Sequence, residues 1–304
     1  MYKRKRKKKR QSWDDRIYTV ITQALLIFFV IIVAYPIYFV VVASVTDPAY
    51  VNNGTVLLYP KGFTLLGYQK VFTDNRIWIC YANTIYYTVL GTGLGTCATV
   101  MGGYALSRKD LPGRGILMKL FVFTMYFSGG TIPYYLVVKN LGLVDTRLIL
   151  ILAGSVSAYN IIVVRSFMES SIPAELFDAA TIDGCGNGTF FFRIVLPLSK
   201  AVIAVMVMFI AVSYWNSYFN AMIFITDSDK YPLQLYLRQL LLTASVSSND
   251  MAAGMDREAI TKLELMVQVI KYGVIVVSTL PIICVYPFIQ KYFVKGVMIG
   301  SIKG

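Results

Sequence analysis

Hydrophobic residues gather in long runs along this chain, and shorter polar stretches separate the runs. Several runs approach or exceed the roughly 20 apolar residues that a helix needs to cross about 30 Å of hydrocarbon. The pattern predicts an all-α integral membrane protein with spans at residues 17–45, 81–106, 114–136, 147–169, 198–224 and 268–290. The segments at about 46–80 and 225–267 are too polar to span, and we expect each to form short surface helices.

Composition agrees with this pattern. Hydrophobic residues make up 57% of the 304 positions, which exceeds the roughly 45–50% typical of soluble domains. The first apolar run is too long for a signal peptide and lacks an Ala-x-Ala cleavage pattern, so we interpret it as a retained span.

The net charge of +13 is concentrated near the N-terminus, where the run KRKRKKKR at residues 3–10 precedes the first span. A basic tail over residues 1–16 is typical of a cytoplasmic flank and of contact with anionic lipid, and nucleic-acid binding is the less favoured interpretation. The loop after the second span is also basic, with Arg108, Lys109, Arg114 and Lys119. These charges predict that both termini are cytoplasmic.

The residue types that carry catalysis or ion coupling are scarce in the predicted spans. No Asp or Glu lies in the central part of a span, which argues against an ion-coupled carrier. The chain has no histidine and its four cysteines are scattered, so neither a metal site, a disulfide framework nor a membrane-bound enzyme is indicated. No phosphate-binding loop occurs, because GCGNG at 184–188 lacks the lysine. Energy for transport would therefore come from another subunit.

Small residues in the second span predict close helix packing. Gly91 and Gly95 form a Gly-x-x-x-Gly pair, and Gly102 and Gly103 follow. We favour packing over a pore-lining role. The prolines Pro36, Pro133 and Pro281 predict kinks or breaks.

The fifth span carries a polar stripe. Ser213, Asn216, Ser217 and Asn220 have the spacing of one helical face, and aromatic residues flank them. Amides and hydroxyls among aromatic rings suit a polyhydroxylated ligand, but they equally suit hydrogen bonds to neighbouring helices. The residues that could line a substrate path are Asn83, Tyr87, Tyr159, Asn160, Ser213, Trp215, Asn216, Tyr218, Phe219 and Asn220.

The segment at 171–197 connects the fourth and fifth spans and lies in the cytoplasm in this topology. Pro173 suits the first turn of a helix, and Glu175 and Asp178 suit its positive end. Gly184 is expected to end that helix. A short helix with small and apolar side chains that projects from a membrane bundle suits docking into a groove of another protein.

This segment resembles the EAA loop of the membrane subunits of binding-protein-dependent ABC importers, a pattern of the form E-A-A-x3-G-x9-I-x-L-P. The matching residues here are Asp178, Ala179, Ala180, Gly184, Ile194, Leu196 and Pro197, with Asp in place of Glu at the first position. The likeness extends over nearly the whole chain, including GGYALSRKDLPGR, YWNSYFNAM and the terminal QKYFVKGVMIGSIKG. Together these stretches resemble the sugar-importer permeases of the maltose-transporter type, second-subunit branch, closest to the group for oligosaccharides and polysaccharide fragments.

The resemblance implies a type I ABC importer permease fold in a bacterial cell membrane. Its implied partners are a paralogous permease, two cytosolic ATPases that bind ATP and Mg, an extracellular sugar-binding protein and membrane lipid. The chain itself would then hold no cofactor and catalyse no reaction. The resemblance also implies that the loop docks on the ATPases through Glu175, Leu176, Asp178, Ala179, Ala180, Ile182, Asp183, Gly184, Ile194, Leu196 and Pro197.

Overall fold

A computed structural model describes residues 13–56, 58–250, 270–284 and 287. The named secondary-structure elements of these residues are all helical, and one isolated bridge joins Thr46 and Phe63. The chain divides into two compact units, one with residues 1–70 and 252–276 and the other with residues 71–251 and 277–304. The basic run at 3–10 and the C-terminal basic tail lie outside the described residues.

Helix α1 (Trp13–Ser44) confirms the first predicted span, and most of its side chains are exposed. Pro36 lies inside this single helix, so the chain does not break at that position. After α1 the chain forms α2 (Pro48–Asn52), whose first turn is capped by Asp47, and then α3 (Leu66–Thr73). The prediction of short helices in the segment at 46–80 is thereby confirmed.

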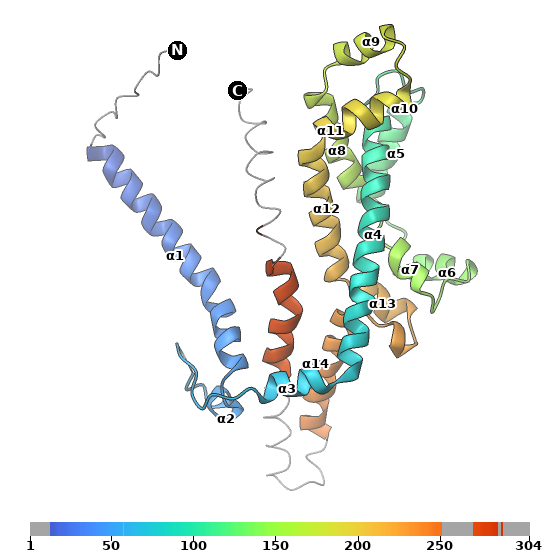
Figure 1. Cartoon of the computed structure of the whole chain (residues 1–304). Coiled ribbons are helices and arrows are strands. Elements are labelled where there is room, and N and C mark those ends of the chain that lie inside the picture. Colours follow the sequence, from blue (N-terminus) through green and yellow to red (C-terminus); the bar gives the residue numbers. More distant parts are fainter. Residues whose placement is uncertain (1–12, 57, 251–269, 285–286, 288–304) are drawn as a thin grey trace. The chain divides into compact units, whose positions relative to one another are not determined.

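Helix α4 (Asn75–Ser107) is the longest element of the second unit. Its 33 residues extend over about 50 Å at 1.5 Å per residue, which is more than the thickness of the hydrocarbon layer. It packs along most of its length on α8 (Ala158–Ser171) and α12 (Lys200–Trp215), as Figure 1 shows. The second predicted span is therefore confirmed.

The glycines of α4 allow these two helices to come close. A Cβ atom added at Gly91 would lie 2.3 Å from the ring of Tyr214 on α12. One added at Gly95 would lie 2.7 Å from the carbonyl oxygen of Ser155, which precedes α8. Such distances leave no room for a side chain, so the prediction of close packing is confirmed.

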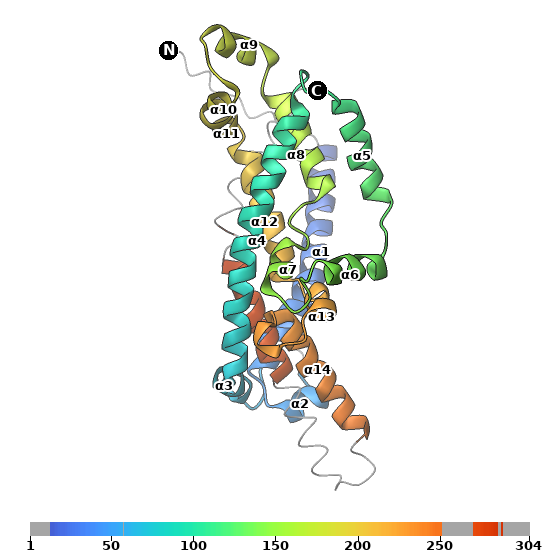
Figure 2. The ribbon, with the colours of Figure 1, turned by 90° about the vertical axis from the view of Figure 1, so that its right-hand side faces the viewer.

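Three other predicted spans are not single helices. Helix α5 (Arg114–Tyr126) ends after 13 residues, and α6 (Thr131–Asn140) turns away from it by 115° (Figure 2). Helix α7 (Arg147–Leu152) is separated from α8, and α12 ends before α13 (Phe219–Phe224) begins. The predicted spans at 114–136, 147–169 and 198–224 are therefore each divided between two or more helices.

Glycine and asparagine account for these breaks. Gly130 and Gly154 have φ angles of 83° and 88°, which glycine adopts at little steric cost. The first break precedes Pro133, so that proline sits in the first turn of α6 and does not itself make the break. At the end of α12 the backbone N–H and the side-chain amide of Asn216 both donate to the carbonyl oxygen of Val212, at 3.1 and 2.9 Å, so Asn216 forms the C-cap of the helix.

Within the described residues, α1 and α4 are long and apolar enough to cross a membrane. The count rises to at most four if the bent pair α5–α6, and the pair Asn187–Leu198 with α12, each form one span. A shorter apolar helix, Ile270–Cys284, lies within the sixth predicted span.

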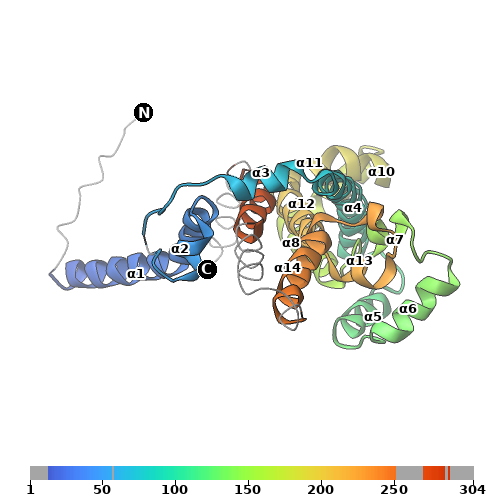
Figure 3. The same ribbon diagram turned by 90° about the horizontal axis from the view of Figure 1, so that it is seen from below.

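The helices beyond the breaks share one hydrophobic core. Val138 of α6, Ile149 of α7 and Phe224 of α13 pack together with Leu235 of α14 (Leu233–Asp250) and with Tyr87 of α4. Figure 3 shows α13 and α14 lying next to each other. Helix α14 and the short helix η2 (Ser228–Lys230) confirm helical structure in the described part of the segment at 225–267.

A second core lies at the other end of α4. It surrounds Phe190 of α10 (Asn187–Phe190) and Val195 of the π-helical turn η1 (Phe191–Val195), with Met168 of α8 and Met206 of α12. The short helices α9 (Ala174–Ile182) and α11 (Leu196–Leu198) complete this end. This core fixes the segment at 171–197 to the helices of the bundle.

Candidate functional site

Helix α9 has well-defined ends. It begins directly after Pro173 and its last turn closes at Gly184, whose φ angle is 75°. The Gly184 N–H donates to the Thr181 carbonyl at 3.0 Å and the Cys185 N–H donates to the Ala180 carbonyl at 2.8 Å. This pair of bonds is the Schellman arrangement, which places a glycine at the left-handed position. The expected helix end at Gly184 is confirmed.

The outer side of α9 is exposed. Ile182 is 87% exposed and Leu176 is 37% exposed, although both are large apolar side chains. On the inner side, Phe177 and Ala180 pack against the core around Phe190. The other predicted coupling residues of this helix and its end are also exposed, namely Glu175, Asp178, Ala179, Asp183 and Gly184.

Ala180 therefore differs from the sequence-based expectation. It is only 9% exposed and contacts the chain's own core, so its small size serves internal packing and not entry into a groove. Ile194 and Leu196 are likewise half-buried against that core, whereas Pro197 is exposed at the start of α11. Only part of the EAA-like pattern is available on the surface of the chain.

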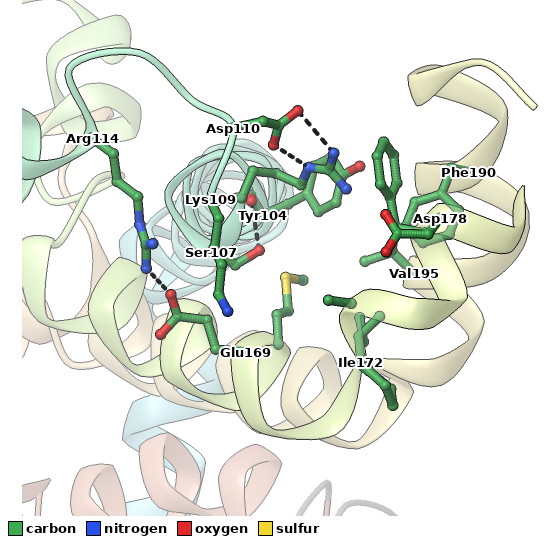
Figure 4. Close-up of a pocket in the computed structure, with 15 residues that line it drawn as sticks. Tyr104, Ser107, Lys109, Asp110, Arg114, Glu169, Ile172, Asp178, Phe190 and Val195 are labelled. Atoms are coloured by element: carbon green, nitrogen blue, oxygen red, sulfur yellow. Dashed lines mark hydrogen bonds and ion pairs between the residues drawn. The ribbon is translucent and has the colours of Figure 1, made fainter. Parts of the chain in front are cut away.

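A cavity of about 610 Å³ lies behind α9. Its walls come from the end of α4, the loop after it, the end of α8, α9 itself and η1 (Figure 4). The Arg108 guanidinium carbon lies 3.2 Å from the centre of the Phe177 ring of α9. Arg108 also makes two hydrogen bonds of 2.9 Å to Asp110, and these lower the pKa of that carboxyl group. Arg108 thus links α9 to the end of α4.

A second arginine cluster lies beside this cavity. Arg114 of α5 and Arg165 of α8 both donate to the Leu106 carbonyl oxygen, at 2.8 and 3.3 Å. Both guanidinium groups also pair with Glu169, and Figure 4 shows the pair with Arg114. Positive charge at a helix C-terminus is favourable, so the cluster stabilises the end of α4 and joins three helices. Sequence reasoning did not find it, since its members are far apart in the chain.

At the other end of the unit, two predicted path residues have structural partners. The Asn83 amide donates to the carbonyl oxygens of Asp229 at 2.7 Å and Tyr231 at 3.2 Å. The Tyr87 hydroxyl donates to the Lys230 carbonyl at 2.8 Å. Both side chains therefore hold the turn before α14 against α4.

The same turn is held by Asp145, which has a φ angle of 59°. Its carboxylate accepts the N–H groups of Asp227 at 3.1 Å and Thr226 at 3.2 Å, and it lies 3.5 Å from the Lys230 ammonium group. The backbone donors, with Lys230, lower the pKa of Asp145. No sequence pattern pointed to this residue.

The polar stripe of the fifth predicted span does not lie on one helical face, because the helix ends at Trp215. Trp215 is buried and its indole N–H donates to the Ser278 carbonyl at 3.0 Å. Tyr218 and Phe219 are 37% and 50% exposed at the break. The remaining candidates are exposed (Tyr159, Ser213, Asn216) or half-buried (Asn160, Asn220).

These features define an all-helical protein with long and interrupted apolar helices and with a short helix, α9, that exposes apolar side chains. No family model matches the chain. It is 40% identical over 290 residues to the "Polygalacturonan/rhamnogalacturonan transport system permease protein YtcP" of Bacillus subtilis, covering 95% of this chain and 99% of that one. It is also 40% identical to "Protein LplC" of the same organism, over 88% and 89% of the two chains.

A solved structure is similar over the same length. The crystal structure of "a bacterial ABC transporter involved in the import of the acidic polysaccharide alginate" matches with a TM-score of 0.81 and 34% identity. The match covers 94% of this chain and 99% of that one. The chain therefore belongs to the permease family of carbohydrate ABC importers, which are transport components of the bacterial cell membrane. The expected resemblance is confirmed.

Proposed function

We propose that this chain forms half of the translocation path of an ATP-driven importer for an oligosaccharide or polysaccharide fragment. In this proposal it crosses the membrane six times, with both termini in the cytoplasm, and pairs with a paralogous permease. The basic loop around Arg108 and Arg114 supports this orientation, since cytoplasmic loops are rich in Lys and Arg. The names of the relatives support a carbohydrate substrate.

The observation that carries the proposal is the exposed apolar side of α9. Among the described residues, Ile182 is largely exposed and Leu176 is partly exposed, yet the helix is held firmly by its inner side and by its Gly184 end. A rigid helix with uncovered apolar side chains suits a groove in a folded partner. We propose that this partner is a cytosolic ATPase, that two such subunits bind ATP and Mg, and that this chain catalyses no reaction.

The proposed path runs along the breaks in the helices. Non-helical backbone at membrane depth is tolerated where it lines a water-filled cavity or is buried in protein. The break at 216–218 exposes Tyr218 and Phe219 beside the amides of Asn216 and Asn220, which suits the faces and hydroxyl groups of a sugar. An extracellular binding protein would deliver that sugar from the α14 end of the unit.

The test measures whether the ATPase assembles with the permeases and whether binding protein and sugar stimulate its hydrolysis of ATP. The chain is expressed with its paralogous permease and the ATPase, and the complex is purified and assayed with binding protein and sugar. Ala179→Glu adds charge on the exposed side of α9, and we expect it to lower both ATPase occupancy and stimulated hydrolysis. Asn140→Glu places the same charge on the exposed end of α6 and should leave both unchanged. Normal occupancy and turnover in the Ala179→Glu complex would contradict the docking role of α9.

A further inference from the structure

We propose that Arg238 binds the carboxylate group of an acidic sugar at the break between α12 and α13. The inference rests on the proposed function and specifies its substrate class, a uronic-acid oligosaccharide. Arg238 lies on α14, which packs with α13 in one core (Figure 3). It is not among the residues that the sequence suggested for the path.

The geometry leaves Arg238 free to bind an anion. Its guanidinium carbon lies 4.7 Å from the centre of the Tyr218 ring. Such a contact places the cation over the ring but provides no carboxylate or carbonyl acceptor for its N–H donors. A carboxylate can therefore accept two parallel hydrogen bonds from the guanidinium group. The tyrosine ring holds the arginine in place for this bond.

Within the described part of the chain, Arg238 is the half-buried basic residue that has no carboxylate partner. The other half-buried basic side chains are Arg108, Arg114, Arg165 and Lys230, and each pairs with a carboxylate. Arg238 has only the tyrosine ring. A half-buried charge without a counter-ion is unfavourable, so the position favours binding of an anion.

Three acidic groups of the same unit are engaged elsewhere. Asp74 accepts the hydroxyl of Tyr236, which lies two residues before Arg238 on the same helix. Asp145 and Asp227 pair with Lys230. Helix α13 carries no charged residue. The anion for Arg238 is therefore expected from outside this part of the chain.

The surroundings of Arg238 fit a sugar that carries the charge. Phe219 is 50% exposed beside Tyr218 and offers a face on which a pyranose ring can stack. On the two sides of the same break, Asn220 offers an amide group for hydroxyls, and Asn216, whose amide nitrogen donates to the Val212 carbonyl, offers its amide oxygen. A bare inorganic anion would need none of these groups, and a neutral sugar would leave Arg238 unpaired. Independent support comes from the relatives, whose printed names include polygalacturonan and alginate.

The experiment measures uptake by the complete complex in proteoliposomes with its binding protein. The probes are trigalacturonate and its methyl ester, which has the same backbone without the charges. The binding protein's affinity for each probe is measured separately, since a permease variant cannot change it. Arg238→Gln should lower trigalacturonate uptake at subsaturating concentration by about tenfold or more, the loss expected for one charge-assisted pair. Arg238→Lys should retain more uptake, and uptake of the ester should change by less than about twofold.

The matched control is Arg147→Gln, which removes an exposed positive charge from α7 and should leave uptake of both probes unchanged. Equal losses for the acid and the ester would show a structural role for Arg238 and overturn the inference. So would unchanged uptake in Arg238→Gln, or a wild-type complex that transports only the ester or other neutral oligosaccharides. ATP-driven uptake would persist in these three cases, which leaves the proposed function intact. A wild-type complex that transports no carbohydrate would overturn the proposed function, and the inference with it.

Discussion

Truncation of Ile182 to alanine tests the docking helix most directly. The substitution removes three carbon atoms from a side chain that is 87% exposed. At about 0.8 kcal/mol for each buried carbon, burial in an ATPase groove would contribute about 2 kcal/mol. Since 1.4 kcal/mol corresponds to a tenfold change, the dissociation constant of the ATPase should rise about 30-fold. The stability of the chain itself should change by less than about 0.5 kcal/mol, because an exposed side chain makes few internal contacts.

The assay titrates fluorescently labelled ATPase onto the purified pair of permeases in nanodiscs. Ile132→Ala is the control, because Ile132 is 74% exposed on α6 and lies away from α9. We expect that excess ATPase restores binding-protein-stimulated hydrolysis to the Ile182→Ala complex, since the defect is in affinity. An unchanged dissociation constant, or an equal loss in both variants, would refute the reasoning.

Three further substitutions test the helix end, the close packing and the path. Gly184 has a φ of 75°, so Gly184→Leu should strain the backbone by about 1–2 kcal/mol and weaken binding of the ATPase. Gly184→Asn should weaken it less. Both effects are measured by the ATPase titration described above. Gly91→Ala would place a Cβ 2.3 Å from the ring of Tyr214 and should destabilise the protein by about 1–3 kcal/mol in thermal unfolding, whereas Gly93→Ala meets nothing within 4 Å and should be neutral. Asn216→Cys, made without the native cysteines, should react with a hydrophilic thiol reagent at a rate that depends on nucleotide; absence of reaction in every state would indicate a packing role.

The long helices and the α9 loop could be predicted from sequence because their signals are local. Helices α1 and α4 could be predicted from their continuous hydrophobic sequence, because that signal does not depend on which helices pack against them. The end of α9 follows from one glycine, since Gly184 is the residue that can adopt the left-handed position there at least cost.

The breaks could not be predicted in the same way. Glycines are common inside membrane helices, so the sequence does not distinguish Gly95, which packs within α4, from Gly154, which interrupts the helix. The difference lies in the neighbours: Gly95 is closely approached by the Ser155 carbonyl, which belongs to the non-helical segment just before α8, whereas nothing lies within 4 Å of a Cβ added at Gly154. The prediction that Asn216 and Asn220 lie on one face of a helix was wrong for the same reason, because the sequence did not reveal the break between α12 and α13.

The attachments at the two ends of α4 connect α9 with the proposed path. At one end, Arg108 joins α4 to Phe177 of α9, and the Leu106 carbonyl is held by Arg114 and Arg165. At the other end, the Asn83 side chain holds the turn that leads into α14, the helix that carries Arg238. Both attachments are made to one continuous helix, so displacement of α9 can be transmitted along α4 without a change in any of its own hydrogen bonds. Coupling of this kind needs a rigid element with attachments at each end, and α4 is the helix of the second unit that runs unbroken between the two cores.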